Sequence, residues 1–232
     1  LIFLMNVYLR FTKLKNLKNT VHISIIIVSG LAFLFNAKYL SASAAFLACV
    51  SIVLDLCLSR RIRKDFDHLY RTAYFDSLTG IPSRTSADMY IAECTDPQAV
   101  SIVIADLDGL KMINDTYGHQ TGDILIRDFA FSFSEAAFSL GFAARNGGDE
   151  FLAIFQGTDS AKRAEIFCQK LKESIDRRNN FSEHSISYSI GFASGKDLQN
   201  ASVSEIISHA DACMYQQKQG KKSPRETSDR RN

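Results

Sequence analysis

The sequence predicts an α/β (α+β) sandwich, with helices over a mostly antiparallel sheet, preceded by a membrane region. Two observations predict this organisation. Residues 1–64 contain nine Lys or Arg and one acidic residue, whereas residues 65–232 contain eighteen basic and twenty-four acidic residues. Within the acidic part, segments with strand periodicity alternate with amphipathic helical segments, which is typical of a mixed α and β domain. An acidic domain behind a basic, apolar one argues against nucleic acid as a partner.

The basic part predicts a transmembrane helical hairpin within residues 1–58. The apolar runs at about 20–37 and 39–58 are each long enough to span roughly 30 Å of hydrocarbon as a helix, and residues 1–9 fit the end of an earlier span. Four basic residues precede the first run and four follow the second, and only Lys38 lies in the turn. By the positive-inside rule, both ends of the hairpin face the cytoplasm. The alternative is a buried helical hairpin of a soluble domain.

Residues 59–75 predict a linker helix between this region and the rest of the chain. Ile62, Phe66, Leu69 and Ala73 have the spacing of a heptad seam. Two heptads are too few to decide between pairing with a second copy and packing on the helix's own domain.

Residues 76–222 form the predicted α/β domain, and the polar residues 223–232 are expected to be a disordered tail. Strands are expected at 101–110, on both sides of a glycine turn within 141–155, and at 184–194. Helices are expected at 126–138, 160–178 and 202–220. The glycine turn predicts a β-hairpin, which is why the sheet is expected to be mostly antiparallel.

Acidic residues stand where two of these strands are expected to end. Asp106 and Asp108 close the first strand, and Asp149 and Glu150 follow the glycine pair at 147–148. Carboxylates from two strand ends can bind a hard cation such as Mg²⁺ or Mn²⁺. We expect Asp106 and Asp108 to point to opposite faces, so that only Asp106 joins the other two in a metal site for phosphoryl transfer. Spacing alone leaves open that these are ordinary solvated turn residues.

Five motifs in chain order resemble the GGDEF-domain diguanylate cyclase family. They are DSLTGIPSR (76–84), ADLDGLKMINDTYGHQTGD (105–123), RNGGDEF (145–151), SYSIGFAS (187–194) and ADACMYQQKQGKK (210–222). The resemblance implies a five-stranded sheet wrapped by helices, related to nucleotidyl cyclases and polymerase palms. It also implies a reaction, the condensation of two GTP into cyclic di-GMP with release of pyrophosphate, carried out by a homodimer. Together with the hairpin, it implies a multi-pass protein of the bacterial inner membrane with a cytoplasmic GGDEF domain.

The resemblance assigns catalytic and metal-binding roles to four residues. It implies that Asp106, Asp149 and Glu150 are catalytic and that, with the backbone carbonyl of Leu107, they bind Mg²⁺ or Mn²⁺. Glu150 matches the acid that also activates the attacking 3′-hydroxyl.

Substrate-binding roles follow from the same resemblance. The implied residues are Asn114, Asp123, Lys111, Gly147, Gly148 and Lys218. Asn114 and Asp123 match the guanine readers, and a carboxylate suits guanine because it accepts from two N–H donors. The two lysines match phosphate contacts, and the two glycines leave room for the nucleotide. Asn114 as a helix cap and Lys218 as a solvated helix-end lysine remain alternatives.

Two departures from the family pattern bear on function. The closing motif is one residue shorter than usual between Lys218 and Gly220. Residues 138–141, Phe-Ser-Leu-Gly, stand where many relatives carry RxxD, so no allosteric product site is expected. Two functions therefore remain: an active cyclase, or a catalytically silent GGDEF domain that binds GTP or a protein partner.

Overall fold

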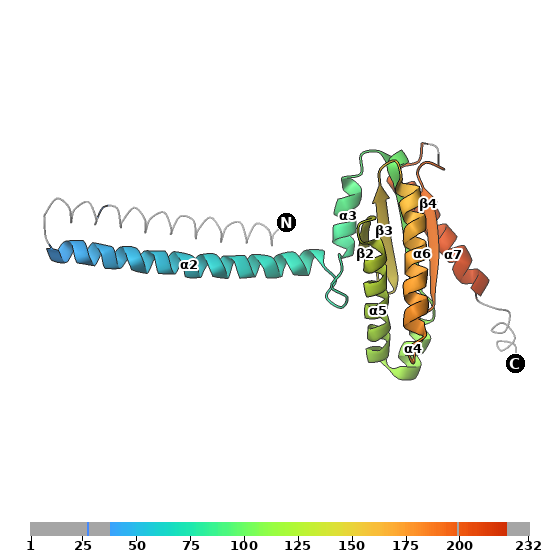
Figure 1. Ribbon diagram of the computed structural model, residues 1–232, viewed down its shortest axis with the longest axis horizontal. Coiled ribbons are helices and arrows are strands. Elements are labelled where there is room, and N and C mark those ends of the chain that lie inside the picture. Colours follow the sequence, from blue (N-terminus) through green and yellow to red (C-terminus); the bar gives the residue numbers. More distant parts are fainter. Residues whose placement is uncertain (1–26, 28–37, 199, 222–232) are drawn as a thin grey trace. The chain divides into compact units, whose positions relative to one another are not determined.

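The computed structural model describes residues 27, 38–198 and 200–221. The chain divides into two compact units, Leu1–Leu69 and Tyr70–Asn232. The second unit holds the sheet and the helices around it (Figure 1). The first predicted span at 20–37, apart from residue 27, lies outside the described residues, as do the segment 1–9 and the tail 223–232.

One helix, α2 (Lys38–Tyr74), covers the second predicted span and the predicted linker without interruption. The prediction of a membrane span at 39–58 is wrong, because no helix among the described residues is long and apolar enough to cross a membrane. Helix α2 includes Asp55 within its apolar part and then continues into a segment that carries Arg60, Arg61, Arg63 and Lys64. The predicted multi-pass inner-membrane location is contradicted with it.

The sheet consists of four strands in the described part of the chain: β1 (Val100–Leu107), β2 (Phe142–Arg145), β3 (Glu150–Gln156) and β4 (Tyr188–Ser194). Their order is β2-β3-β1-β4, and every neighbouring pair is antiparallel. The predicted antiparallel sheet is confirmed, but among the described residues the sheet has four strands rather than the five expected from the family resemblance. Strand periodicity in the sequence indicated only these four.

The last strand begins later than its alternating pattern predicts. Both backbone groups of Ile186 are hydrogen-bonded to the side chain of Asn179 rather than to β1. The N–H of Ile186 donates to Oδ1 of Asn179 at 2.8 Å, and the carbonyl of Ile186 accepts from Nδ2 at 2.9 Å. Residues 184–187 are therefore not part of the described strand, and β4 starts at Tyr188.

In the described residues after α2, five helices and a short 3₁₀ turn surround the sheet. They are α3 (Arg84–Ala92), η1 (Pro97–Ala99), α4 (Leu110–Tyr117), α5 (His119–Ala137), α6 (Ser160–Asn179) and α7 (Val203–Lys221). The helices predicted at 160–178 and 202–220 lie within one residue of α6 and α7. Helix α5 starts seven residues before its predicted start, because Gly118, at φ +86°, lets the chain turn sharply from α4 into α5.

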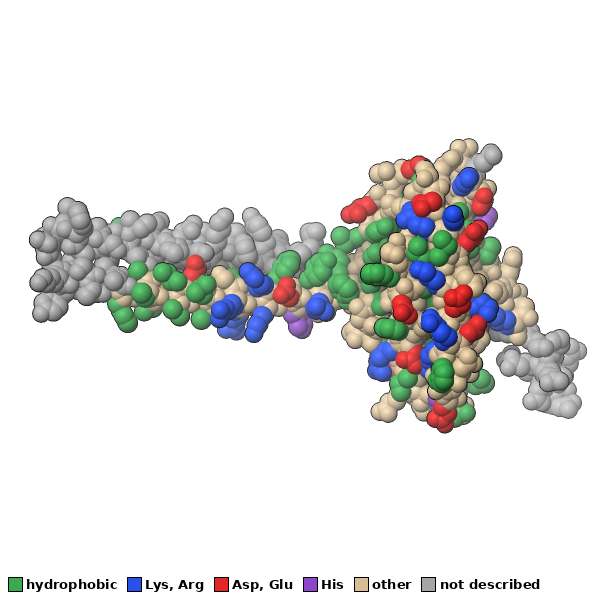
Figure 2. Space-filling view, viewed as in Figure 1, with side chains coloured by type: hydrophobic (Ala, Val, Ile, Leu, Met, Phe, Trp, Pro, Cys, Tyr) green, Lys and Arg blue, Asp and Glu red, His purple; other side chains and the backbone are tan. Residues whose placement is uncertain are grey.

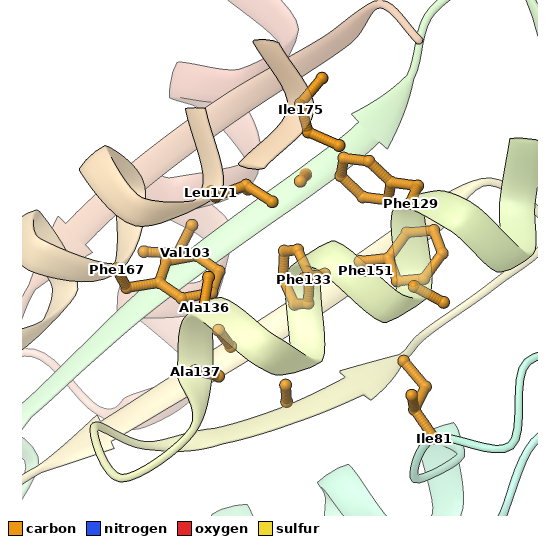
Figure 3. Close-up of a cluster of buried hydrophobic side chains, with 14 of the residues drawn as sticks. Ile81, Val103, Phe129, Phe133, Ala136, Ala137, Phe151, Phe167, Leu171 and Ile175 are labelled. Carbon is orange, nitrogen blue, oxygen red and sulfur yellow. The ribbon is translucent and has the colours of Figure 1, made fainter. Parts of the chain in front are cut away.

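An aromatic core fills the space between one face of the sheet and α5 with α6 (Figures 1 and 3). Phe129 and Phe133 of α5 contact the ring of Phe151, with centroids 4.8 and 5.5 Å apart, and Phe133 meets Phe167 of α6 edge-on at 4.9 Å. All four side chains are fully buried. Burial of each ring contributes about 1.5–3 kcal/mol, so this layer dominates the stability of the domain.

A second core lies on the opposite face, beneath α3 and α7. Ile206, Ala210 and Met214 of α7 belong to one buried cluster with Ile102 and Ile154 of the sheet. Because helices cover both faces, all eight residues of β1 are buried. The architecture is a three-layer sandwich in which β1 lies at the centre.

Gly191 of β4 sets how closely α7 approaches the sheet. A Cβ at this position would lie 2.0 Å from the carbonyl oxygen of Ala210 and 2.3 Å from the amide nitrogen of Met214. Both are backbone atoms of a packed helix and cannot rotate away.

We expect Gly191→Ala to lower the free energy of unfolding by about 1–3 kcal/mol or more, because the added methyl group overpacks the contact between α7 and β4. Chemical denaturation of the variant and the parent chain measures the difference. Gly220→Ala is the matched control, since a Cβ there meets nothing within 4 Å. Equal stability of the Gly191 variant and the parent would show that α7 does not pack at this distance.

Candidate functional site

The acidic residues singled out in the sequence meet at one end of the β1–β3 ladder. Asp106 and Glu150 are directly opposite each other in the antiparallel register. The next rung is formed by the N–H of Leu107, which donates to the carbonyl of Asp149 at 3.1 Å. Strand pairing thus brings two pairs of neighbouring residues together, Asp106 with Leu107 and Asp149 with Glu150. The two pairs are more than forty positions apart in the sequence.

The tip of the β2–β3 hairpin is held by a network that begins far away in the sequence. The guanidinium of Arg145 donates to the carbonyl of Gly148 at 2.6 Å and to the carboxylate of Asp76 at 2.8 Å. Asp76 also accepts from the backbone N–H and the hydroxyl of Thr79, at 2.9 and 2.6 Å. The segment at 76–79 therefore braces the turn that carries Asp149 and Glu150.

Asp76 and Arg145 were not among the residues predicted for the site. Both stand in quoted motifs, but their contact joins positions 69 residues apart, and no local pattern signals it. Burial acts to raise the pKa of Asp76, and the hydrogen bonds from Thr79 and Arg145 outweigh it, so the pKa lies below its ordinary value of 3.8.

Asp106 lies in a much drier environment, only 6% exposed at the end of the buried strand β1. Its carboxylate forms an ion pair with Lys218 of α7 at 2.5 Å. Burial raises the pKa of Asp106; the Lys218 ammonium opposes this, while the charges of Asp149 and Glu150 add to it. The repulsion by these two acids means that a positive charge is needed at this end of the sheet.

The prediction that Asp106 and Asp108 point to opposite faces of the sheet is wrong. Residues i and i+2 of a strand share a face, and both carboxylates pair with lysines of α7, Asp106 with Lys218 and Asp108 with Lys221. Asp108 accepts from the hydroxyls of Ser187 at 2.9 Å and Ser189 at 2.7 Å, and pairs with Lys221 at 2.9 Å. Burial acts to raise the pKa of Asp108, but these hydrogen bonds hold it below the ordinary value. Asp108 thus anchors the loop after β1, and the shortened closing motif places one lysine on each acid.

A second cluster forms where α4 meets α5. The predicted helix-cap role of Asn114 is not observed, because Asn114 lies inside α4 and Gly109 occupies the cap. Its side-chain Oδ1 is buried and has no hydrogen-bond partner in the structure. A Cβ on Gly122 would lie 1.9 Å from this oxygen, so the amide packs directly against the first turns of α5, beside the half-buried Asp123. An unpartnered buried acceptor next to a carboxylate suits a ligand that carries N–H donors.

The remaining predicted residues are Lys111 on α4 and the two glycines of the hairpin turn, whose backbone groups contact Arg145 and Glu150. Lys111 is exposed on the first turn of α4. A Cβ on Gly147 would lie 3.2 Å from the carboxylate of Glu150, and one on Gly148 would meet nothing within 4 Å. A small pocket beside the loop after β1 is lined by Leu107, Asp108, Leu110, Ile113, Leu125, Ser185, Ile186 and Ser187.

The donor atoms at this end of the β1–β3 ladder are all oxygen atoms. Three carboxylates and the Leu107 carbonyl are hard oxygen ligands of the kind that Mg²⁺ and Mn²⁺ prefer. As the side chains stand, no group of three or more His, Cys, Asp or Glu in the described part of the chain is close enough to hold a metal. The donor chemistry fits a divalent cation, and Lys218 supplies the positive charge at Asp106 in this structure.

Comparison with known proteins gives one consistent result. A family model described as diguanylate cyclase, GGDEF domain, matches residues 73–224. The chain is 31% identical over 158 residues to the diguanylate cyclase DgcS of Shewanella oneidensis, covering 66% of this chain and 52% of that protein. It is 32% identical over 196 residues to the cyclic di-GMP phosphodiesterase PdeR of Escherichia coli, covering 81% of this chain and 29% of that protein. The chain thus spans about half or less of these relatives.

Solved structures agree with the sequence comparison. The crystal structure of the coiled coil and GGDEF domain of DgcB from Caulobacter crescentus, in complex with c-di-GMP, matches with a TM-score of 0.61 and 27% identity, covering 74% of this chain and 94% of that one. The diguanylate cyclase SiaD of Pseudomonas aeruginosa, solved with its activator SiaC, matches with a TM-score of 0.55 at 21% identity, which supports the fold alone.

The Asp76–Arg145 network predicts a specific dependence of stability on pH. The ionised form of Asp76 is favoured in the folded state, so its stabilisation is present above pH 3.8 and is lost as the pH falls through the lower folded pKa. Asp76→Asn should reduce the free energy of unfolding at pH 7 by about 1 kcal/mol and flatten its decline below pH 4. Denaturant titrations at several pH values measure this. Asp211→Asn, an exposed acid on α7, is the control; identical profiles for the two variants would contradict the assignment.

Proposed function

Because the chain belongs to the GGDEF-domain diguanylate cyclase family, we propose that it condenses two GTP molecules into cyclic di-GMP. The observation that supports this most directly is the gathering of Asp106, Asp149 and Glu150 at one end of the β1–β3 ladder, next to a hairpin tip with open space at Gly148. The three carboxylates repel one another, and that of Asp106 is desolvated. Such a site favours binding of divalent cations, which in turn bind the phosphates of a substrate.

The proposed reaction consists of two equivalent phosphoryl transfers. The 3′-hydroxyl oxygen of one GTP attacks the α-phosphorus of the other, the bond to the β-phosphate bridge breaks, and pyrophosphate leaves. The hydroxyl proton passes to a base on the protein or to water. In the second transfer, the 3′-hydroxyl of the other nucleotide attacks the remaining α-phosphorus, which closes the ring and releases the second pyrophosphate. The product contains two guanylyl units, and no oxidant or reductant is needed.

Each acid has a separate part in this scheme. Asp106 and Asp149, with the Leu107 carbonyl, would hold the divalent cation, and Glu150 would receive the proton of the 3′-hydroxyl. A bound Mg²⁺ or Mn²⁺ neutralises the triphosphate and lowers the pKa of the attacking hydroxyl. The hydrogen-bonded turn keeps Glu150 in place: its carbonyl accepts from the N–H groups of Asn146 and Gly147, at 2.8 and 3.3 Å.

Guanine would be recognised between α4 and α5. The carboxylate of Asp123 accepts from the two N–H donors on the guanine edge, and the buried Asn114 oxygen gains the partner that it lacks. Adenine has no such donor pair and would leave these acceptors unsatisfied, which costs affinity. Lys111, exposed at the start of α4, would contact phosphate.

Two chains are required because each site would hold one GTP and the product joins two. We therefore propose a homodimer in which the acid-bearing ends face each other. Residues 138–141 present no arginine or aspartate at the end of α5, so we also expect no strong non-competitive inhibition by the product.

One observation favours a second candidate function. Asp106 is already paired with Lys218 at 2.5 Å, and a domain whose metal-binding acid stays neutralised by its own lysine would bind GTP without turning it over. This is the catalytically silent regulatory module.

Glu150→Gln tests the first function. We expect cyclic di-GMP formation from GTP and Mg²⁺ to fall by about 100-fold or more, because a removed general base costs 10²–10⁴-fold in rate, while the melting temperature changes little at this half-buried turn. Chromatography of the products gives the rate, and calorimetry gives GTP affinity. Glu165→Gln, an exposed acid of α6, is the matched control. Wild-type turnover by the Glu150 variant would remove this residue from the mechanism, and a parent chain that binds GTP without product would favour the silent module.

Lys218→Met distinguishes the two functions without an activity assay. If Lys218 and a divalent cation compete for the Asp106 carboxylate, the variant should gain more thermal stability from added Mg²⁺ than the parent does, and at lower Mg²⁺ concentration. Melting curves over a Mg²⁺ series measure this, with Lys221→Met, which frees Asp108 instead, as the control. If Mg²⁺ shifts the melting temperature of neither the parent nor the Lys218 variant, cation binding at Asp106 is contradicted.

A further inference from the structure

The outward face of α5 carries a stripe of exposed apolar side chains that the proposed reaction does not use. Ile124, Phe131 and Phe138 are 50%, 68% and 79% exposed, the last at the C-cap of the helix. They are spaced by seven residues, close to two helical turns, so they share one face. We call them the α5 stripe. Figure 2 shows apolar side chains at intervals over the face where Figure 1 places α5, with charges of both signs between them.

The stripe lies opposite the face of α5 that packs on the sheet. Phe129 and Phe133 are fully buried against the core, whereas Phe131 between them points away from it. Three large apolar side chains in one exposed row are more than scattered surface residues, and such a row marks an interaction site.

Two charged residues flank the centre of the stripe symmetrically. Arg127 lies four residues before Phe131, and Glu135 lies four residues after it. Both are exposed, and neither side chain forms an ion pair with another residue that the structure describes.

This pattern is complementary to itself when two α5 helices run antiparallel. With Phe131 on the two-fold axis, a residue that precedes it by a given number meets the residue that follows it by the same number on the second copy. Arg127 then faces Glu135 of the second copy, twice, and Ile124 packs on Phe138 of the second copy, twice. A parallel arrangement would instead place Arg127 on Arg127 and Glu135 on Glu135, which repel.

We propose that the α5 stripe is an interface between two copies of this chain, paired antiparallel about Phe131. The occupant is a second copy rather than an anionic surface, because the arginine and the glutamate balance each other and only an antiparallel copy offers the opposite charge at both places. The acids at the end of the β1–β3 ladder take no part, so this contact is distinct from the face-to-face arrangement proposed for catalysis.

Cysteine cross-linking in the full chain tests both the contact and its direction. In Ile124→Cys/Phe138→Cys, the two thiols of one chain are fourteen residues apart on the helix, about 21 Å, which is too far for an internal disulfide. Mild oxidation followed by peptide mass spectrometry then identifies which cysteines join between chains, including any of the five native ones. We expect the 124–138 link to exceed the 124–124 and 138–138 links by about tenfold. Lys170→Cys, exposed on α6, gives the background of chance collisions.

Charge reversal in the same double-cysteine chain supplies the decisive control. Arg127→Glu or Glu135→Arg alone places like charges opposite each other, and each should reduce the 124–138 link by about tenfold. The two reversals together restore opposite charges and should restore the link. A link no faster than the Lys170→Cys background, an excess of 124–124 and 138–138 links, or a double reversal that fails to recover would each overturn the proposal.

Discussion

The burial of β1 on both faces is the constraint on which the site depends. Helices α5 and α6 cover one face and α3 and α7 the other, so the strand passes through the driest part of the domain and ends at Asp106. A carboxylate there loses its water and also meets two further acids across the ladder. Such a group is tolerated only with a positive charge beside it. The structure supplies this charge from α7, and the proposed chemistry supplies it as a divalent cation.

Hydrogen bonds of Arg145 hold the hairpin tip in place relative to Asp106. Arg145 links the Gly148 carbonyl to Asp76, and the segment after Asp76 is in turn hydrogen-bonded to the last turn of α2: the N–H of Ser83 donates to the Tyr74 carbonyl at 2.9 Å. Positional precision at the glycine turn thus comes from a charged, partly buried contact rather than from apolar packing. A short chain of polar groups runs from the end of a helix to the proposed catalytic edge.

The parts that the sequence predicted are those with local signals. The glycine pair between two apolar strands indicated the hairpin, whereas the prediction that Asp106 and Asp108 diverge failed because residues two apart on a strand share a face. The ion pair between Asp106 and Lys218 joins positions 112 residues apart, so it had no local signature. Helices α3 and α4 are only nine and eight residues long, too short for a clear periodic pattern. The predicted membrane span failed because its apolar residues belong to a helix that continues into a charged segment.

The glycine at position 122 also limits how this domain can be engineered. Replacing a helical glycine by alanine is a standard route to higher thermal stability, worth up to about 1 kcal/mol. Here the missing methyl group is the space that the Asn114 amide occupies. A stability screen that scores helix propensity alone would select this substitution, and it would improve the helix while displacing the Asn114 amide beside Asp123. Thermostabilised versions of the domain therefore need the glycine at 122 held fixed, and their gains taken from positions such as Gly220, where an added methyl group meets open space.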